Sequence, residues 1–122
     1  MKILLIDDDS LHLSSLKTSL EVRNYKCISF LCPVSAIEAY RKEHFDVVIT
    51  AVRMLEITGE EVLKTVHNIN PDAKVILIVN FDDVRINIMK DDGVYALFCK
   101  PIVIDELVRI LEEIEEKPAK NI

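Results

Sequence analysis

Short apolar runs alternate with amphipathic stretches along the whole chain. Residues 3–6 form a continuous apolar run, which is typical of a strand buried on both faces. The run at residues 74–79 is rich in β-branched side chains, which also favour strands. The pattern as a whole predicts five strands, at residues 3–6, 27–31, 46–50, 74–79 and 96–99.

Between these strands, apolar residues recur at the spacing that places them on one face of a helix. Asp9 or Ser10 can cap the first helix, and Pro33 suits the first turn of the second. Three further helices are predicted at residues 58–69, 83–90 and 104–116. Gly93 ends the second of these three. The residues expected to face the core are Leu13, Leu16, Leu20, Ala36, Ile37, Tyr40, Val62, Leu63, Val66, Ile69, Ile104, Leu107, Val108, Leu111 and Ile114.

Strands that alternate with helices and are buried on both faces predict a parallel sheet covered by helices on both sides. Right-handed crossovers then limit the topology to a doubly wound sheet. We therefore predict an α/β fold, a doubly wound five-stranded parallel sheet flanked by helices. Ligands of such sheets bind beyond the carboxyl ends of the strands. The residues predicted at those ends are Asp7, Asp8, Ala51, Val79, Asn80 and Lys100.

Length and composition are those of one globular domain. The 122 residues suit a single core, and a hydrophobic content of 50% disfavours disorder. We expect a domain at residues 1–117 and a tail or the start of a linker at 118–122. A net charge of −6 disfavours nucleic acid and anionic membranes as partners. No apolar run approaches the roughly 20 residues that span a bilayer.

The cysteines and histidines show no catalytic or metal-binding spacing. The three cysteines, at positions 27, 32 and 99, have neither zinc nor redox spacing, and their odd number fits a reducing compartment such as the cytoplasm. We expect all three thiols to be buried or half-buried. His12, His44 and His67 are expected on the surface or on a helix face, away from the strand ends.

Two short polar motifs follow predicted strands. Asp7, Asp8 and Asp9 are adjacent carboxylates, which repel one another and are retained for a cation or a helix cap. Mg²⁺ prefers such oxygen ligands. Lys100 follows the last strand, where its ammonium group can reach a phosphate or an acidic pocket. Taken singly, the motifs are better explained as a helix cap with solvated loop acids, and as a turn at Pro101.

Taken together, the motifs resemble the receiver domain of bacterial two-component response regulators over the whole chain. The resemblance rests on Asp7-Asp8, Val52-Arg53-Met54, Gly59, Asn70-Pro71-Asp72, Phe81-Asp82-Asp83, Gly93 and Lys100-Pro101. It implies a flavodoxin-like, receiver-type sheet. In that family the acidic pair holds Mg²⁺, an aspartate at the end of the third strand accepts a phosphoryl group, and the lysine binds that group. A hydroxyl residue and an aromatic residue then switch, and the lysine–proline peptide is often cis.

The chain departs from this pattern at the switch itself. Ala51 stands at the position of the phospho-acceptor, Val79 at that of the hydroxyl residue and Leu97 at that of the aromatic. Alanine cannot form an aspartyl phosphate. We therefore predict a degenerate receiver that is independent of phosphorylation. Asp7 and Asp8 alone are expected to hold Mg²⁺ weakly or as a vestige, and Lys100 can pair with either of them.

The leading functional prediction is a module that acts in signalling by docking to a protein and is not an enzyme. Its partner is expected to be a histidine kinase, an effector domain or a second copy in a homodimer. In the family the docking face is the fourth helix, fifth strand and fifth helix. Here that face includes Arg85, Asn87, Lys90 and Leu97. Leu97 is either an exposed anchor or the residue that fills the space of the missing aromatic.

Two alternatives remain. One is a conventional phospho-accepting receiver with an engineered alanine at position 51, against which Val79 and Leu97 argue. The other is a small enzyme or nucleotide binder on the same fold. The chain has only two glycines, Gly59 and Gly93, so it lacks a glycine-rich phosphate loop, which disfavours the second alternative.

Overall fold

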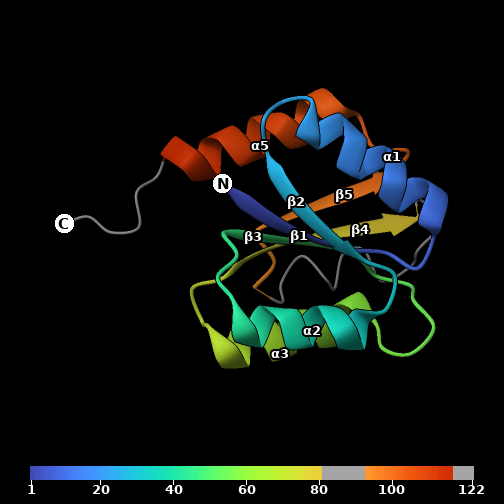
Figure 1. The fold of residues 1–122 in the computed structure, drawn as a ribbon, viewed down its shortest axis with the longest axis vertical. Coiled ribbons are helices and arrows are strands. Elements are labelled where there is room, and N and C mark those ends of the chain that lie inside the picture. Colours follow the sequence, from blue (N-terminus) through green and yellow to red (C-terminus); the bar gives the residue numbers. More distant parts are fainter. Residues whose placement is uncertain (81–92, 117–122) are drawn as a thin grey trace.

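The computed structural model of this protein describes residues 1–80 and 93–116. Within them lies a five-stranded parallel sheet in the order β2-β1-β3-β4-β5 (Figure 1). The strands are β1 (Lys2–Ile6), β2 (Lys26–Phe30), β3 (Val47–Ala51), β4 (Lys74–Asn80) and β5 (Ala96–Lys100). Each lies within one residue of its predicted position at either end. The predicted fold class is confirmed.

Helices cover both faces of the sheet (Figure 1). The described helices are α1 (Ser10–Glu21), α2 (Pro33–Lys42), α3 (Gly59–Ile69) and α5 (Ile104–Glu116). One core layer packs the sheet against α2 and α3, and the other packs it against α1 and α5. None of these helices is long and apolar enough to cross a membrane. The helix predicted at residues 83–90 lies outside the described residues, together with Arg85, Asn87 and Lys90.

The interior strand β1 has an uninterrupted apolar sequence because both of its faces are covered. Leu4 and Ile6 belong to the core layer beneath α2 and α3, whereas Ile3 and Leu5 belong to the layer beneath α1 and α5. All four side chains are at most 2% exposed. Successive side chains of a strand point to opposite faces, so a strand covered on both sides needs an apolar residue at every position.

Local capping fixes where the helices begin. Of the two predicted caps of α1, Asp9 is the one used, and its carboxylate accepts from the backbone N–H groups of Leu11 and His12. At the start of α3, Thr58 and Glu61 form a reciprocal capping box. Both caps lie directly after the loops that follow β1 and β3, so they fix how these helices leave the carboxyl edge of the sheet.

Two expectations about burial are wrong, those for Ile69 and Cys99. Ile69 is 36% exposed, because it is the last residue of α3, where the helix ends. On α5 the predicted stripe does face the core: Leu107 and Leu111 are buried, and Ile104, Val108 and Ile114 are half-buried and pack against the same layer. Cys99 is exposed, because β5 has a strand neighbour on one side only among the described residues. Cys27 is buried and Cys32 half-buried, as expected.

Candidate functional site

The parallel register brings the predicted site residues to one edge of the sheet. Ile6 pairs with Thr50 across β1 and β3, and Asn80 pairs with Lys100 across β4 and β5. The loops that leave these strands therefore start side by side. Asp7 directly follows β1, and Ala51 ends β3. The fold therefore brings together, at this carboxyl edge, the residues from which the sequence predicted a site.

Asp7 is the buried centre of the site. It is 4% exposed. Its Oδ1 accepts a hydrogen bond from the backbone N–H of Asp9 at 3.0 Å. Its Oδ2 lies 2.7 Å from Nδ1 of His12 and 3.4 Å from Nζ of Lys100. Of the two ion pairs that the sequence left open for Lys100, the structure contains the one with Asp7.

These contacts determine the charge of Asp7. Burial acts to raise the pKa of its carboxyl group, but the hydrogen bonds from His12 and the Asp9 backbone, together with the charge of Lys100, outweigh burial and hold the pKa below its ordinary value. Asp7 is therefore a carboxylate at neutral pH. A carboxylate can only accept hydrogen bonds, so Nδ1 of His12 is the donor in their contact.

His12 lies on a helix, α1, as predicted, but the prediction that it lies away from the strand ends is wrong. Its side chain is 22% exposed and contacts Asp7, the residue that follows β1. Because Asp9 caps α1, the first turn of the helix stands directly beyond the end of β1, and His12 faces back toward the strand. The signal in the sequence was a histidine in the first turn after a cap that follows the acidic pair. His44 and His67 contact Asp46 and the carbonyl of Ala73 instead, away from this site.

Asp8 connects two loops of the carboxyl edge. Its side chain is exposed, and its Oδ2 accepts a hydrogen bond from the backbone N–H of Leu55 at 3.1 Å. Leu55 lies in the loop between β3 and α3 and is 93% exposed. The loop after β1 is thus tied to the loop after β3 through Asp8, and to β5 through Asp7 and Lys100.

Ala51 lies buried at the end of β3, with 4% of its surface exposed. The start of α3 approaches it closely, since the backbone N–H of Gly59 donates to the carbonyl of Val52 at 2.8 Å. A Cβ atom at position 59 would lie 2.4 Å from the carbonyl oxygen of Ala51. Only glycine fits there without a shift of the backbone.

Val79 and Leu97, the two other predicted switch positions, pack in the core. Val79 is 2% exposed and is part of the layer between the sheet and α2 and α3. Leu97 is half-buried and packs against the same layer. The contacts of Leu97 therefore favour the space-filling alternative over an exposed anchor.

The described side chains at this edge, within residues 1–80 and 93–116, do not fit a magnesium site. Mg²⁺ requires near-octahedral oxygen ligands and gives up its waters reluctantly. Both carboxylate oxygens of Asp7 and one of Asp8 already accept from donors of the chain, and the side chain of Ala51 supplies no ligand atom. Within residues 1–80 and 93–116, no group of three or more His, Cys, Asp or Glu side chains is arranged to hold a metal ion.

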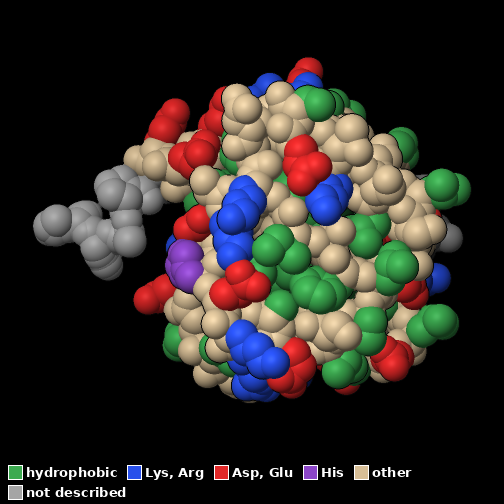
Figure 2. All heavy atoms as spheres, viewed as in Figure 1, with side chains coloured by type: hydrophobic (Ala, Val, Ile, Leu, Met, Phe, Trp, Pro, Cys, Tyr) green, Lys and Arg blue, Asp and Glu red, His purple; other side chains and the backbone are tan. Residues whose placement is uncertain are grey.

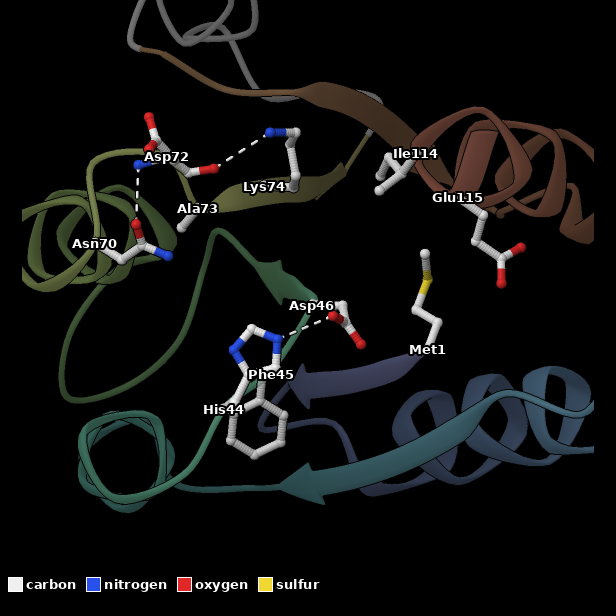
Figure 3. A pocket seen from close by; sticks show the side chains of 10 residues that line it. All are labelled: Met1, His44, Phe45, Asp46, Asn70, Asp72, Ala73, Lys74, Ile114 and Glu115. Carbon is white, nitrogen blue, oxygen red and sulfur yellow. Dashed lines mark hydrogen bonds and ion pairs between the residues drawn. The ribbon is translucent and has the colours of Figure 1, made fainter. Parts of the chain in front are cut away.

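A second feature, a hollow of about 700 Å³, lies at the opposite edge, where β1, β3 and β4 begin (Figure 3). Several of its polar groups are paired with one another. His44 contacts Asp46 at 3.0 Å, and Nζ of Lys74 donates to the carbonyl of Asp72 at 3.2 Å. We therefore place the candidate site at the carboxyl edge.

The outer rim of the carboxyl edge is apolar. Among the large hydrophobic side chains that are exposed in this protein, Leu11 and Leu31 follow β1 and β2, Val34 lies in the first turn of α2, and Leu55 follows β3. Figure 2 shows apolar side chains near the centre of this view and along its right-hand side, where β4 points in Figure 1, with charged side chains of both signs between them. The site is thus bordered by apolar surface.

The strand order and a carboxyl edge with an acidic pair and a lysine define a flavodoxin-like domain of the receiver type. The family described as response regulator receiver domain matches residues 3–112, and the chain belongs to this family. It is thereby a receiver domain of two-component response regulators. Receiver domains bind Mg²⁺ at their phosphorylation site. The Lys100–Pro101 peptide is cis, as the resemblance implied.

Individual relatives support the same assignment. The response regulator receiver protein CpdR of Brucella abortus is 31% identical over 92% of this chain and 94% of its own length. The C4-dicarboxylate transport transcriptional regulatory protein DctD of Rhizobium meliloti is 27% identical over 94% of this chain. This chain spans only about 25% of that regulator's length. A response regulator receiver domain protein from Clostridium thermocellum superposes with a TM-score of 0.85 at 26% identity, over 93% of this chain and 92% of that one.

Proposed function

We propose that this receiver domain does not accept a phosphoryl group and acts in two-component signalling by docking to another protein. The observation that carries the proposal is Ala51, a buried methyl group at the end of β3, at the edge where Asp7 and Lys100 meet. Phosphoryl transfer to a receiver requires a nucleophile at this place, and a methyl group has no electron pair to offer.

The residues that would transmit a phosphorylation signal support the same proposal. Val79 has no hydroxyl group to bond to a phosphoryl oxygen, and Leu97 has no ring to rotate between two positions. Both side chains pack in the apolar core. A ligand shifts a conformational equilibrium only through contacts that differ between the two states, and neither residue offers such a contact.

Docking is supported by the apolar rim of the carboxyl edge, because exposed apolar surface bordered by polar groups is typical of protein interfaces. The proposed partner is a histidine kinase, an effector domain or a second copy of this chain. The family's docking face lies partly outside the described residues; β5 and α5 are described, and Leu97 is the one residue named above for this face that lies within them. We propose a cytoplasmic role without catalytic turnover, and without nucleic acid or membrane as a partner.

The first prediction is that acetyl phosphate leaves the protein unmodified. Incubation with excess acetyl phosphate and Mg²⁺ should produce no covalent adduct in intact-mass spectra recorded in acid. Asp46, the nearest aspartate along the chain, precedes β3 and contacts His44 and the backbone of Lys2 at the opposite edge of the sheet.

The Ala51→Asp variant is the positive control for this experiment, since it differs only by the carboxylate that the proposal says is missing. An adduct of one phosphoryl group on any aspartate of the unmodified sequence would contradict the proposed function.

The second candidate function is a conventional receiver in which the acceptor aspartate has been replaced by alanine. It is favoured by Asp7, Asp8 and Lys100, which keep the positions of the acidic pair and the lysine. The two candidates differ in what restoration of an aspartate achieves. A conventional receiver would recover the whole conformational switch, whereas the proposed degenerate receiver would recover phosphorylation alone.

A further inference from the structure

The buried carboxylate of Asp7 is neutralised by the chain itself. A carboxylate removed from water is costly unless it is paired and fully hydrogen-bonded. Here Oδ2 is shared between Nζ of Lys100 at 3.4 Å and Nδ1 of His12 at 2.7 Å, and Oδ1 accepts from the backbone of Asp9 at 3.0 Å. Both side-chain oxygens of Asp7 therefore accept from a donor among the described residues. Asp7 therefore needs no metal ion to be stable in the folded state.

The same contacts connect the loops of the carboxyl edge. Lys100 ends β5, His12 lies in the first turn of α1, and Asp7 joins them. Asp8 joins the loop after β3 through the N–H of Leu55 at 3.1 Å. A divalent cation coordinated by both carboxylates would hold these loops together in a similar way. In this chain, Lys100, His12 and the backbone N–H of Leu55 connect the loops instead, as donors to Asp7 and Asp8.

A cation that enters this site has to displace these donors. Lys100 carries a positive charge that repels a divalent ion, and the Nδ1 proton of His12 points at the oxygen that the ion needs. The side chains of Lys100 and His12 are only 26% and 22% exposed, so both are held against the site by packing as well as by charge.

We propose that Lys100 and His12 take the place of a divalent cation at Asp7, and hold the carboxyl edge in one arrangement without metal. This inference rests on the proposed function, because a domain that transfers no phosphoryl group has no use for a bound ion. It gives His12 a specific role, as the second internal donor in a site that otherwise resembles that of its family.

The test is a titration of metal-free protein with Mn²⁺, which prefers the same oxygen ligands as Mg²⁺ and broadens the amide signals of nearby residues. The unmodified domain is compared with Lys100→Met and His12→Ala. Lys74→Met and His44→Ala are the matched controls, since they remove a lysine and a histidine that contact other groups at the opposite edge. The readouts are the amide signals of Asp9 and Leu55 and the melting temperature.

Selective broadening is expected in Lys100→Met at Mn²⁺ concentrations at least about tenfold lower than in the unmodified domain, the size of one charge–charge interaction in a solvated pocket. His12→Ala should shift in the same direction by less. In both, the melting temperature should fall without metal and rise again with Mn²⁺. The two control variants should behave as the unmodified domain does.

The proposal is overturned if the unmodified domain binds Mn²⁺ at Asp9 and Leu55 as tightly as Lys100→Met does, or if neither variant gains affinity. Should Lys100→Met fail to fold, His12→Ala and the unmodified domain still decide between these outcomes. No phosphoryl donor is present in this titration. An adduct in the acetyl phosphate experiment would therefore contradict the proposed function and leave this measurement unaffected.

Discussion

Replacement of Ala51 by aspartate is expected to convert a domain without any phosphoryl adduct into one that forms it from acetyl phosphate and Mg²⁺. The new carboxylate would stand at the end of β3, at the edge that already carries Asp7, Asp8 and Lys100. Charged groups held in position account for most of the catalysis of phosphoryl transfer. The new carboxylate also competes with Asp7 for Lys100, which would remove one of the two donors that contact Oδ2 of Asp7.

The matched control is Ala51→Asn, which has nearly the same shape as aspartate but no nucleophilic oxygen. It should form no adduct under the same conditions. If Ala51→Asp remains unmodified over the same period as well, then the donors around Asp7 prevent phosphorylation, and the missing acceptor is not the sole defect.

Restoration of the acceptor should not restore the switch. With beryllofluoride as the phosphoryl mimic, changes in the amide spectrum of Ala51→Asp are expected in the loops after β1, β3 and β5. Val79 cannot bond to the mimic, and Leu97 is fixed in the core layer beneath α2 and α3. Large changes that spread through residues 83–90 and along β5 would show that coupling survives, and would favour the conventional receiver.

The largest loss of stability is expected from Gly59→Ala. Its Cβ would lie 2.4 Å from the carbonyl oxygen of Ala51 and 2.8 Å from the Cα of Val52, and both are backbone atoms that cannot rotate away. Either α3 or the end of β3 has to move. We expect a loss of about 2 to 3 kcal/mol in the free energy of unfolding, the upper part of the range for overpacked sites. Thermal unfolding should then occur roughly 10 °C lower.

The expected direction of the change, a loss of stability, distinguishes this close approach from an ordinary replacement of glycine by alanine. Replacement of glycine by alanine where the backbone conformation allows it stabilises a protein by about 0.4 to 1 kcal/mol, so without the close approach the substitution would stabilise the domain. The control is Asn68→Ala at an exposed position of the same helix, which should change the free energy of unfolding by no more than about 0.5 kcal/mol. A Gly59→Ala variant that melts at or above the temperature of the unmodified domain would contradict the contact between α3 and β3.

The pattern of apolar residues was sufficient to predict the sheet and its helices. The run at residues 3–6 needed a partner layer on each side, and the structure provides both, because alternate side chains of a strand point in opposite directions. Parallel strands place their carboxyl ends at one edge, so the sequence also predicted that Asp7, Ala51 and Lys100 meet. The identity of residue 51 already excluded an acyl phosphate at that position.

Only the tertiary structure decided which side chains touch. The sequence left Lys100 free to pair with Asp7 or Asp8, because the choice depends on distances between loops that are far apart along the chain. It missed His12 for the same reason. The direction of a side chain in the first turn of α1 follows from the angle at which the helix leaves Asp9 and crosses the sheet. The packing of Leu97 and the need for glycine at position 59 likewise arise where elements that are far apart along the chain meet. The order of apolar and polar residues does not give the distance between such elements in the fold.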